Sequence, residues 1–297
     1  MRILLTGATG FLGKAWLARR AAEHEITVVG RSRPEGVPLA GHVPVDFADP
    51  GSLARLVDAG SLPGSIDRVV HLAVSRGHRG FPGTAADLFE VNVASAAALL
   101  RYAHVAGAGG FIMGSTGSVY DGCEDGPLDE ARPLTPKRYF PSSKYAAELL
   151  AGEYRKFFPV ATLRYFAPYG PGQDDRLLPD LFGRVLSGRP VTLPATGGGM
   201  QMAAIYVDDA LDVLDGAIAG AWDTTMNVAA PGNVTIEELA LLIGKVTGRT
   251  PVFERTGPAP TYSLVPELDR LLAVRGGKAF TSLEDGLRAM YRAMGPA

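Results

Sequence analysis

The sequence predicts an α/β fold in which a doubly wound parallel sheet is followed by a smaller C-terminal lobe. Short apolar runs rich in β-branched residues are typical of strands buried in a parallel sheet, and they occur at residues 2–6, 26–30, 68–73 and 110–115. Alanine- and leucine-rich stretches of helical length follow, for example at 85–107 and 145–158. Because strands alternate with helices, we expect βαβ crossovers that build one sheet.

Composition excludes several classes of protein. The chain has 297 residues, of which 46% are hydrophobic and 20% charged, so it is long enough to bury a sizeable core. A net charge of -2 gives no electrostatic reason to expect nucleic acid or an anionic membrane as a partner. The N-terminal sequence lacks the features of a signal peptide and no apolar run has the length of a membrane span, so we expect a cytoplasmic protein.

Cysteine and metal chemistry are not expected. Cys123 is the only cysteine, which excludes an internal disulfide and a thiolate metal cage. His, Cys and Asp residues do not cluster at metal-ligand spacing, so the sequence predicts no metal.

A glycine-rich turn joins the first predicted strand to the first predicted helix. Its sequence is GATGFLG, residues 7–13. Glycines permit a tight turn and close backbone approach, so that the free N–H groups of the helix N-terminus can hold a pyrophosphate. The order of strand, turn and helix therefore predicts a Rossmann-type dinucleotide site. The residues expected to bind the cofactor here are Gly7, Thr9, Gly10, Phe11, Leu12 and Gly13.

The pattern of elements predicts two parts with a boundary near residue 168. We expect residues 1–167 to form the dinucleotide-binding domain. From Pro168 onward, loops rich in proline and glycine interrupt shorter strands and helices. Residues 168–297 are therefore predicted to form a smaller substrate-binding lobe, partly interleaved with the first domain.

The end of the second strand predicts the form of the cofactor. When the cofactor is NAD, this strand usually ends in an acidic residue that accepts from the ribose hydroxyls. Here it ends in Gly30, followed by Arg31, Ser32 and Arg33, which favours the 2′-phosphate of NADP, with NAD as the alternative. Asp46, after the third strand, is placed to accept from the adenine amino group. Phe47, Leu72 and Ala73 complete the predicted cofactor site.

Seven segments together carry a family resemblance. In chain order they are TGATGFLG (6–13), VVHLA (69–73), Asn92, STGSVY (115–120), RYFPSSK (138–144), LRYFAPYGPG (163–172) and YVDD (206–209). This series resembles the extended short-chain dehydrogenase/reductase family, whose members act as epimerases, dehydratases and reductases. The resemblance covers nearly the whole chain and implies an NAD(P)-dependent enzyme.

The resemblance also implies catalytic residues. In that family a Ser or Thr hydroxyl binds the reacting oxygen, a Tyr exchanges the proton with it, and a Lys holds the nicotinamide ribose and lowers the pKa of the Tyr. Thr116 matches the hydroxyl, and Lys144 matches the lysine. The tyrosine position, four residues before the lysine on the same helix face, is Phe140.

A phenyl ring cannot donate a proton, so Phe140 needs an explanation. Tyr139 lies about 100° around the helix and Tyr145 lies beyond the lysine, so neither simply replaces the missing phenol. One explanation is an inactivated variant of a catalytic tyrosine. The other is a natural phenylalanine in a protein that uses another acid or performs no redox chemistry.

Departures from the family pattern bear on reaction and substrate. Relatives that eliminate water carry an Asp-Glu pair after the catalytic Thr, where this chain has Gly117 and Ser118, so dehydration is not expected. Relatives that bind nucleotide-diphospho sugars usually have Asn at the position of Ala167 and commonly Arg at that of Met202. We predict that Ser115, Ala167 and Met202 face the substrate.

The sequence as a whole favours an NADP-dependent, ketoreductase-like oxidoreductase. It would transfer a hydride to or from a carbonyl or alcohol carbon of a sugar-like or natural-product small molecule. The alternatives are an NAD-dependent sugar epimerase and, from another class, a non-catalytic dinucleotide-binding sensor or scaffold.

Long apolar helices at 85–107 and 140–158 predict a homodimer. Arg164 and Asp209 are predicted to be structural.

Overall fold

The computed structural model describes residues 1–297 except 124–125, 127, 175, 259–262 and 296–297. The chain divides into two compact units. Unit 1 consists of Met1–Asp121, Leu134–Arg164 and Leu211–Met226. Unit 2 consists of Gly122–Pro133, Tyr165–Ala210 and Asn227–Ala297. Each unit is therefore assembled from segments that are distant in the sequence.

A seven-stranded sheet with the order β11-β6-β5-β4-β1-β2-β3 forms the centre of unit 1. The pairs from β3 to β5 are parallel, and Leu4 of β1 lies between Thr27 of β2 and Val69 of β4. The strand order reverses at β1 and β4, which is where this class of sheet binds its ligands. The predicted doubly wound α/β fold is confirmed. The strands are β1 Arg2–Thr6, β2 Glu25–Gly30, β3 Gly41–Pro44, β4 Arg68–His71, β5 Phe111–Thr116, β6 Val160–Tyr165 and β11 Thr224–Val228.

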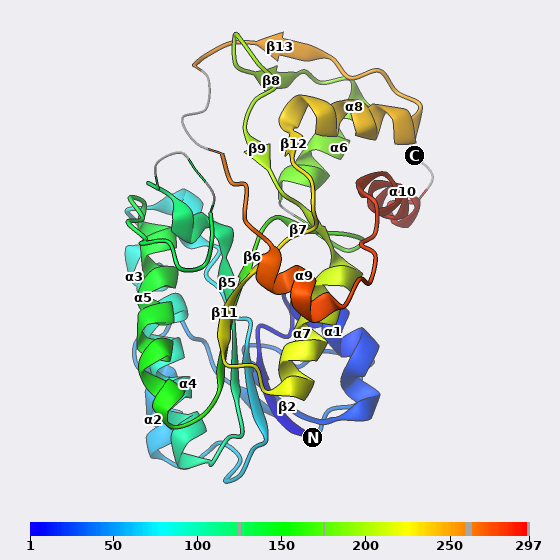
Figure 1. The fold of residues 1–297 in the computed structure, drawn as a ribbon. Helices are drawn as coiled ribbons and strands as arrows, with labels where there is room; N and C mark the ends of the chain where they lie inside the picture. Colours follow the sequence, from blue (N-terminus) through cyan, green and yellow to red (C-terminus); the bar gives the residue numbers. More distant parts are fainter. Residues whose placement is uncertain (124–125, 127, 175, 259–262, 296–297) are drawn as a thin grey trace. The chain divides into compact units, whose positions relative to one another are not determined.

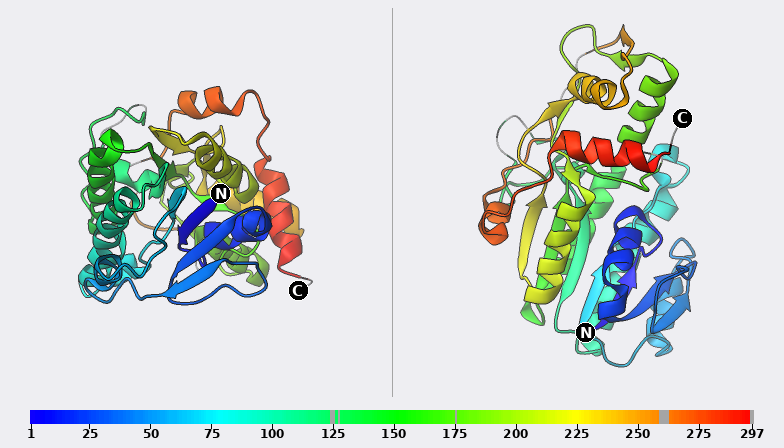
Figure 2. Two further views of the ribbon diagram at one scale, coloured as in Figure 1. Left: turned by 90° about the horizontal axis from the view of Figure 1, so that it is seen from below. Right: turned by 90° about the vertical axis from the view of Figure 1, so that its right-hand side faces the viewer.

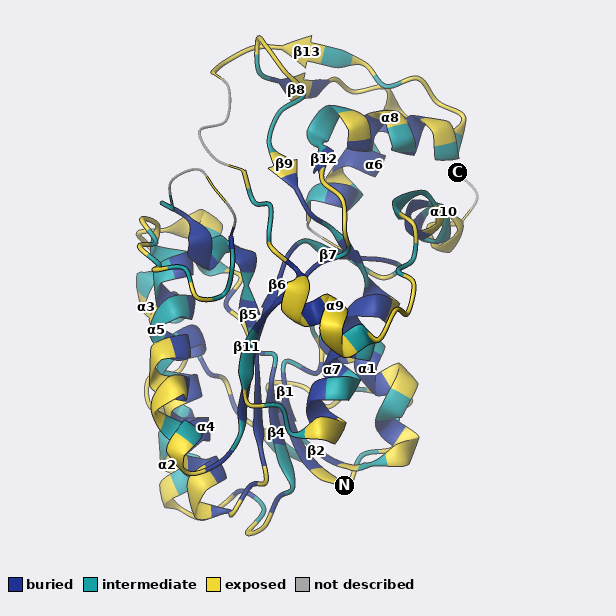
Figure 3. Ribbon diagram, in the orientation of Figure 1, coloured by how far each residue is buried: buried dark blue, intermediate teal, exposed yellow. Residues whose placement is uncertain are grey.

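Helices cover both faces of this sheet, as Figures 1 and 2 show. One face is covered by α2 Ser52–Asp58, α3 Ala85–Phe89, α4 Ser95–Val105 and α5 Tyr139–Glu153. The other is covered by α1 Phe11–Arg20 and α7 Val207–Gly220. Figure 3 shows the inner strands as mostly buried and the outer sides of α4 and α5 as exposed, the pattern expected of a sheet between two helical layers.

The predicted helix at 85–107 is confirmed as one continuous helical run, but it contains an irregular turn. A π-helical segment, Glu90–Ala94, joins α3 to α4. Asn92 lies in this segment and is fully buried. Such π-turns re-aim a side chain from within a helix and are frequent at functional sites.

Unit 2 is built from short strand pairs and helices around its own core. Strands β10 and β7 pair in parallel, β12 and β9 antiparallel, and β13 and β8 in parallel. Side chains of α6, α8 and α10 form much of the core, including Phe182, Leu239 and Leu287. The elements are β7 Pro168–Tyr169, α6 Leu177–Ser187, β8 Val191–Leu193, β9 Gln201–Met202, β10 Ile205–Tyr206, β12 Val234–Thr235, α8 Ile236–Thr247, β13 Phe253–Arg255, α9 Asp269–Arg275 and α10 Leu283–Ala293.

Helix α8 has explicit start and stop signals. Thr235 and Glu238 form a capping box, in which the Thr235 hydroxyl accepts from the Glu238 N–H and the Glu238 carboxylate accepts from the Thr235 N–H. Gly248 follows the last helical residue as the C-cap, and its φ of 70° is left-handed. In the described part of the chain, we find no helix that combines the length and the hydrophobicity needed to cross a membrane.

Ala167 has a left-handed backbone, with φ of 34°. This conformation costs a non-glycine residue about 1–2 kcal/mol. We expect Ala167→Gly to raise the free energy of unfolding by about 1 kcal/mol, partly offset by the greater entropy of glycine in the unfolded chain. Urea denaturation measures this change. Ala59→Gly is the control, because Ala59 has φ of -77° and should gain nothing; equal effects of the two substitutions would contradict the strain.

Candidate active site

The glycine-rich turn of unit 1 is shaped for close backbone approach. Gly7 has φ of 72°, and a Cβ there would lie 2.4 Å from the carbonyl carbon of Leu72. A Cβ at Gly13 would lie 2.2 Å from the carbonyl oxygen of Gly7. These glycines let β1, α1 and the end of β4 meet without side chains between them.

The N-terminus of α1 is suited to an anion. The helix begins at Phe11, and among the described residues no side chain caps it and its first turn has no acidic residue. Its first N–H groups and its dipole therefore favour a phosphate. The turn fits the pyrophosphate of a dinucleotide, as the sequence predicts. Thr9 is exposed, and Gly10, Phe11 and Leu12 are partly exposed.

The remaining predicted cofactor residues follow β2, β3 and β4, at the carboxyl end of the sheet. Arg31, Ser32 and Arg33 are exposed directly after β2. Asp46 is exposed after β3, and its carboxylate accepts from the N–H of Ala48 at 3.0 Å. Phe47 and Ala73 are buried and Leu72 is partly buried. These residues share the sheet edge that carries the glycine-rich turn, because parallel strands end at the same edge.

Lys144 is a buried cation on α5. Its Nζ donates to the carbonyl oxygen of Gly114 in β5 at 2.8 Å, and the residue is 2% exposed. Burial lowers the pKa of Lys144 to about 8, against the opposing attraction of the Glu148 carboxylate. At neutral pH the side chain is still charged, so it can supply positive charge at the end of β5.

Thr116 and Ser115 serve different parts of the structure. Successive residues of a strand point to opposite faces, so the two hydroxyls are directed apart. Thr116 is partly exposed, and its hydroxyl accepts from the Ser118 N–H at 3.1 Å, which starts the 3-10 turn Gly117–Tyr120. Ser115 is buried and its hydroxyl donates to Glu148. Ser115 therefore takes part in the packing of α5 on the sheet.

A buried ion pair fixes α5 to the sheet. Arg164 of β6 donates to Glu148 through Nη2 at 2.7 Å and Nε at 3.1 Å, and through Nη1 to the Tyr120 hydroxyl at 2.8 Å. The side chains of Arg164 and Glu148 are each 6% exposed. The predicted structural role of Arg164 has this physical basis. Asp209 is likewise paired within unit 2, with Arg275 at 2.9 Å, and accepts from the Thr281 N–H at 2.8 Å.

His71, at the end of β4, is held neutral. Burial, with the nearby charge of Lys144 as the smaller cause, lowers the pKa of His71 to about 3. Its Nδ1 lies 2.7 Å from the Thr6 hydroxyl, and its Nε2 lies 3.4 Å from the Ser95 hydroxyl. Ser95 already donates to the Val91 carbonyl, so it can accept from Nε2–H. We therefore assign the proton of the neutral ring to Nε2.

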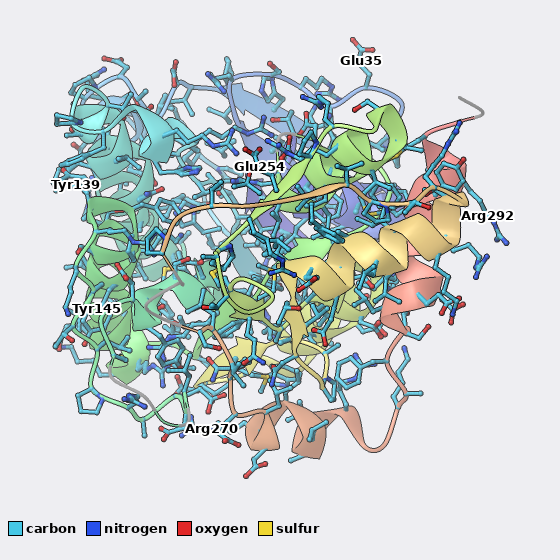
Figure 4. All side chains as sticks on the ribbon, turned by 90° about the horizontal axis from the view of Figure 1, so that it is seen from above. Glu35, Tyr139, Tyr145, Glu254, Arg270 and Arg292 are labelled. Carbon is cyan, nitrogen blue, oxygen red and sulfur yellow. The ribbon has the colours of Figure 1, made fainter. Side chains whose placement is uncertain are left out.

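Phe140 lies one turn before Lys144 on α5 and contacts the ring of a histidine. Its ring and that of His78 have centroids 5.5 Å apart at an angle of 49°. The neighbouring Tyr139 instead stacks on Phe81, with centroids 5.0 Å apart. Figure 4 shows Tyr139 and Tyr145 at the outer side of α5. Neither tyrosine takes the place of the missing phenol.

The two predicted substrate residues of unit 2 have contrasting settings. Ala167 is partly exposed beside β7. Met202 is 6% exposed and belongs to the core of unit 2, where β9 pairs with β12. Met202 thus packs as an ordinary core methionine. Among the described residues, no group of His, Cys, Asp or Glu is placed to hold a metal ion.

A family of known proteins matches most of this chain. Residues 3–229 match the model of the NAD dependent epimerase/dehydratase family. The chain belongs to this family. The predicted resemblance is thereby confirmed, and with it the expectation of an NAD(P)-dependent enzyme.

Individual relatives of this epimerase/dehydratase family member differ in their reactions. dTDP-glucose 4,6-dehydratase of Streptomyces antibioticus is 32% identical over 70% of this chain and 66% of its own length. Low-salt glycan biosynthesis protein Agl12 of Haloferax volcanii is 28% identical over 97% of both chains. The structure of Thermus thermophilus UDP-glucose 4-epimerase in complex with NAD has a TM-score of 0.83 and 25% identity, and the alignment covers 100% of both chains.

Sequence reasoning missed two features of this family member's site. Glu148 had no assigned role, although it lies four residues after Lys144 and so shares its helix face. The contact of His78 with Phe140 was also missed, since the residues are far apart in sequence. The spacing of four residues between Lys144 and Glu148 was the signal in the sequence that could have placed Glu148 near the site.

The neutral state of buried His71 predicts acid sensitivity. Between about pH 6.5 and about pH 3, the unfolded chain binds a proton at His71 that the folded protein does not, so stability falls as the pH falls through this window. We expect His71→Gln to reduce this pH dependence, measured by urea denaturation at several pH values. Val105→Gln, at an exposed position on α4 that carries no titrating group, should leave the slope unchanged. An unaltered slope in His71→Gln would contradict the assignment.

Proposed function

We propose that this protein is an NAD-dependent epimerase of a nucleoside diphosphate sugar, which oxidises one sugar carbon and reduces it again from the opposite face. Family membership and the end-to-end alignment with an NAD-bound UDP-glucose 4-epimerase support this activity. They favour the epimerase alternative over the NADP-dependent ketoreductase that the sequence suggested first. A bound nicotinamide dinucleotide would accept and return the hydride.

The residues that follow Thr116 favour an epimerase over a dehydratase. Elimination of water needs its own acid and base at the sugar. The two residues that follow Thr116 are Gly117 and Ser118, and they form a 3-10 turn without a carboxylate. The dehydratase relative is therefore a guide to the fold and the cofactor site, whereas the reaction proposed here needs proton and hydride transfer alone.

The chain's own residues have distinct proposed tasks. The glycine-rich turn and the N-terminus of α1 would hold the pyrophosphate. The Thr116 hydroxyl would hydrogen-bond the reacting sugar oxygen. The Lys144 ammonium, still charged at neutral pH, would hold the nicotinamide ribose and favour negative charge on that oxygen. Arg31 and Arg33, exposed after β2, keep NADP as the alternative cofactor.

The first experiment identifies cofactor and reaction together. Protein purified without added nucleotide is denatured, and released nucleotides are identified by mass spectrometry. The native protein is then incubated with NAD and UDP-glucose or dTDP-glucose, and products are followed by proton NMR. We expect NAD and the 4-epimer of the sugar. A 4-keto-6-deoxy product would instead establish a dehydratase, exclusive NADP binding would support the ketoreductase, and failure to bind either dinucleotide would support a sensor or scaffold.

A homodimer formed through α4 and α5 is also proposed. Leu149 is 57% exposed on α5, and Phe157, which follows α5, is 55% exposed. Phe157 contacts His104 of α4, with ring centroids 4.6 Å apart, so the ends of the two helices form one apolar surface. Exposed apolar side chains gathered on neighbouring helices are typical of protein interfaces.

A substitution that introduces a single charge tests the proposed dimer interface. We expect Leu149→Glu to convert the dimer to a monomer, because a buried, unpaired carboxylate opposes association. Sedimentation velocity at micromolar concentration measures the change. Leu241→Glu is the control, since Leu241 is 51% exposed on α8 in unit 2. A monomeric native protein would refute the dimer.

A further inference from the structure

The position that carries the proton donor in this family is Phe140, so a protein that performs the proposed reaction needs another acid and base. A suitable group must lie beside residue 140, near the carboxyl end of β5 where Thr116 and Lys144 are found. It must also be able to both give and take a proton near neutral pH. Among side chains, the imidazole of histidine is best suited to this task.

His78 meets the positional requirement. It lies in the 3-10 turn Gly77–Gly80, after β4, and its ring contacts that of Phe140. A centroid separation of 5.5 Å with a tilt of 49° is within the range of aromatic rings in contact. The imidazole is partly buried, as is the phenyl ring. A titratable ring therefore stands against the side chain that lacks a hydroxyl.

The turn that carries His78 is fixed from both sides. Before it, the N–H of Ser75 donates to Asn92 Oδ1 at 2.9 Å, and the Ser75 hydroxyl donates to Asp87 and accepts from the Gly77 N–H. After it, the Thr84 hydroxyl donates to the Gly77 carbonyl. A Cβ at Gly77 would lie 2.9 Å from Asp87 Oδ2, so the turn packs closely against α3 at this position.

The same hydrogen bonds connect the turn to the start of α5. Asn92 Nδ2 donates to the Ser143 hydroxyl at 2.9 Å, and Ser143 donates to the carbonyl oxygen of Phe140 at 2.7 Å. A short path thus runs from the backbone before His78, through the π-turn at Asn92, to the backbone of Phe140. These bonds position the two backbone segments that carry His78 and Phe140.

From this geometry we propose that His78 is the proton donor and acceptor of the reaction, in place of the phenol that Phe140 lacks. The inference rests on the proposed epimerase function. In the oxidation, the sugar O–H bond breaks and its proton passes to an unprotonated imidazole nitrogen, while the C–H bond breaks and its hydride passes to NAD, the oxidant. The return step delivers the hydride to the opposite face of the carbon and returns the proton from the imidazolium to the oxygen, so no net oxidation occurs.

The decisive experiment is a double-mutant cycle with NAD and UDP-glucose as the probes. The four proteins are the native chain, His78→Gln, Phe140→Tyr and the double variant. We expect His78→Gln to lower kcat by about 10²–10⁴ in the native background, the usual contribution of general acid–base catalysis. In the Phe140→Tyr background the same substitution should have little effect, because the phenol supplies the proton. His104→Gln is the matched control and should retain native kcat.

Two further measurements separate a chemical role from a structural one. Free imidazole should restore part of the activity of His78→Gly and none of His104→Gly. In the absence of any dinucleotide, UDP-glucose should shift the imidazole NMR signal of His78, assigned by its loss in His78→Gln, and leave that of His104 in place. Circular dichroism confirms that each variant is folded.

The outcomes distinguish this proposal from the function on which it rests. An active native protein with unimpaired His78→Gln would overturn the role of His78 and leave the epimerase intact. An inactive native protein with an active Phe140→Tyr variant would also overturn it, and would identify residue 140 as an inactivated catalytic tyrosine. If neither protein converts the sugar, both proposals are wrong. An unshifted His78 signal on addition of UDP-glucose would likewise count against His78.

Discussion

The placement of Lys144 depends on the buried ion pair between Arg164 and Glu148. These residues join β6 to α5, and they form further hydrogen bonds with Ser115 and Tyr120. A buried pair depends on such supporting hydrogen bonds, and removing one partner leaves an uncompensated charge that costs about 3–5 kcal/mol. The pair therefore fixes α5 in one position on the sheet, and with it the lysine one turn away.

The charge state of the site follows from burial at the ends of β4 and β5. Lys144 keeps its proton at neutral pH with a pKa of about 8, while burial and the nearby lysine keep His71 neutral. Only one of these two buried groups carries charge. The positive charge is thus localised on Lys144, beside the carbonyl of Gly114, where it can act on a bound ribose and a reacting oxygen.

Phe140 shows how a catalytic position can be supplied from a different element. Tyr139 is adjacent in sequence, but it stacks on Phe81, so helical geometry directs its hydroxyl elsewhere. His78 is distant in sequence, yet the hydrogen bonds of Asn92 bring its turn against the start of α5. In the role proposed for His78, a neighbour outside the family motif supplies the group that Phe140 lacks.

The sequence by itself determined the fold class, the family and the glycine-rich turn, because these depend on local periodicity and on short spacings. The position of Arg31 and Arg33 directly after the second strand was also readable, although the form of the cofactor was not. Tertiary structure decided that Ser115 and Met202 pack in the interior, that Glu148 holds Arg164, and that His78 meets Phe140. Such contacts join segments far apart in the chain, through burial and hydrogen bonds that no local pattern records.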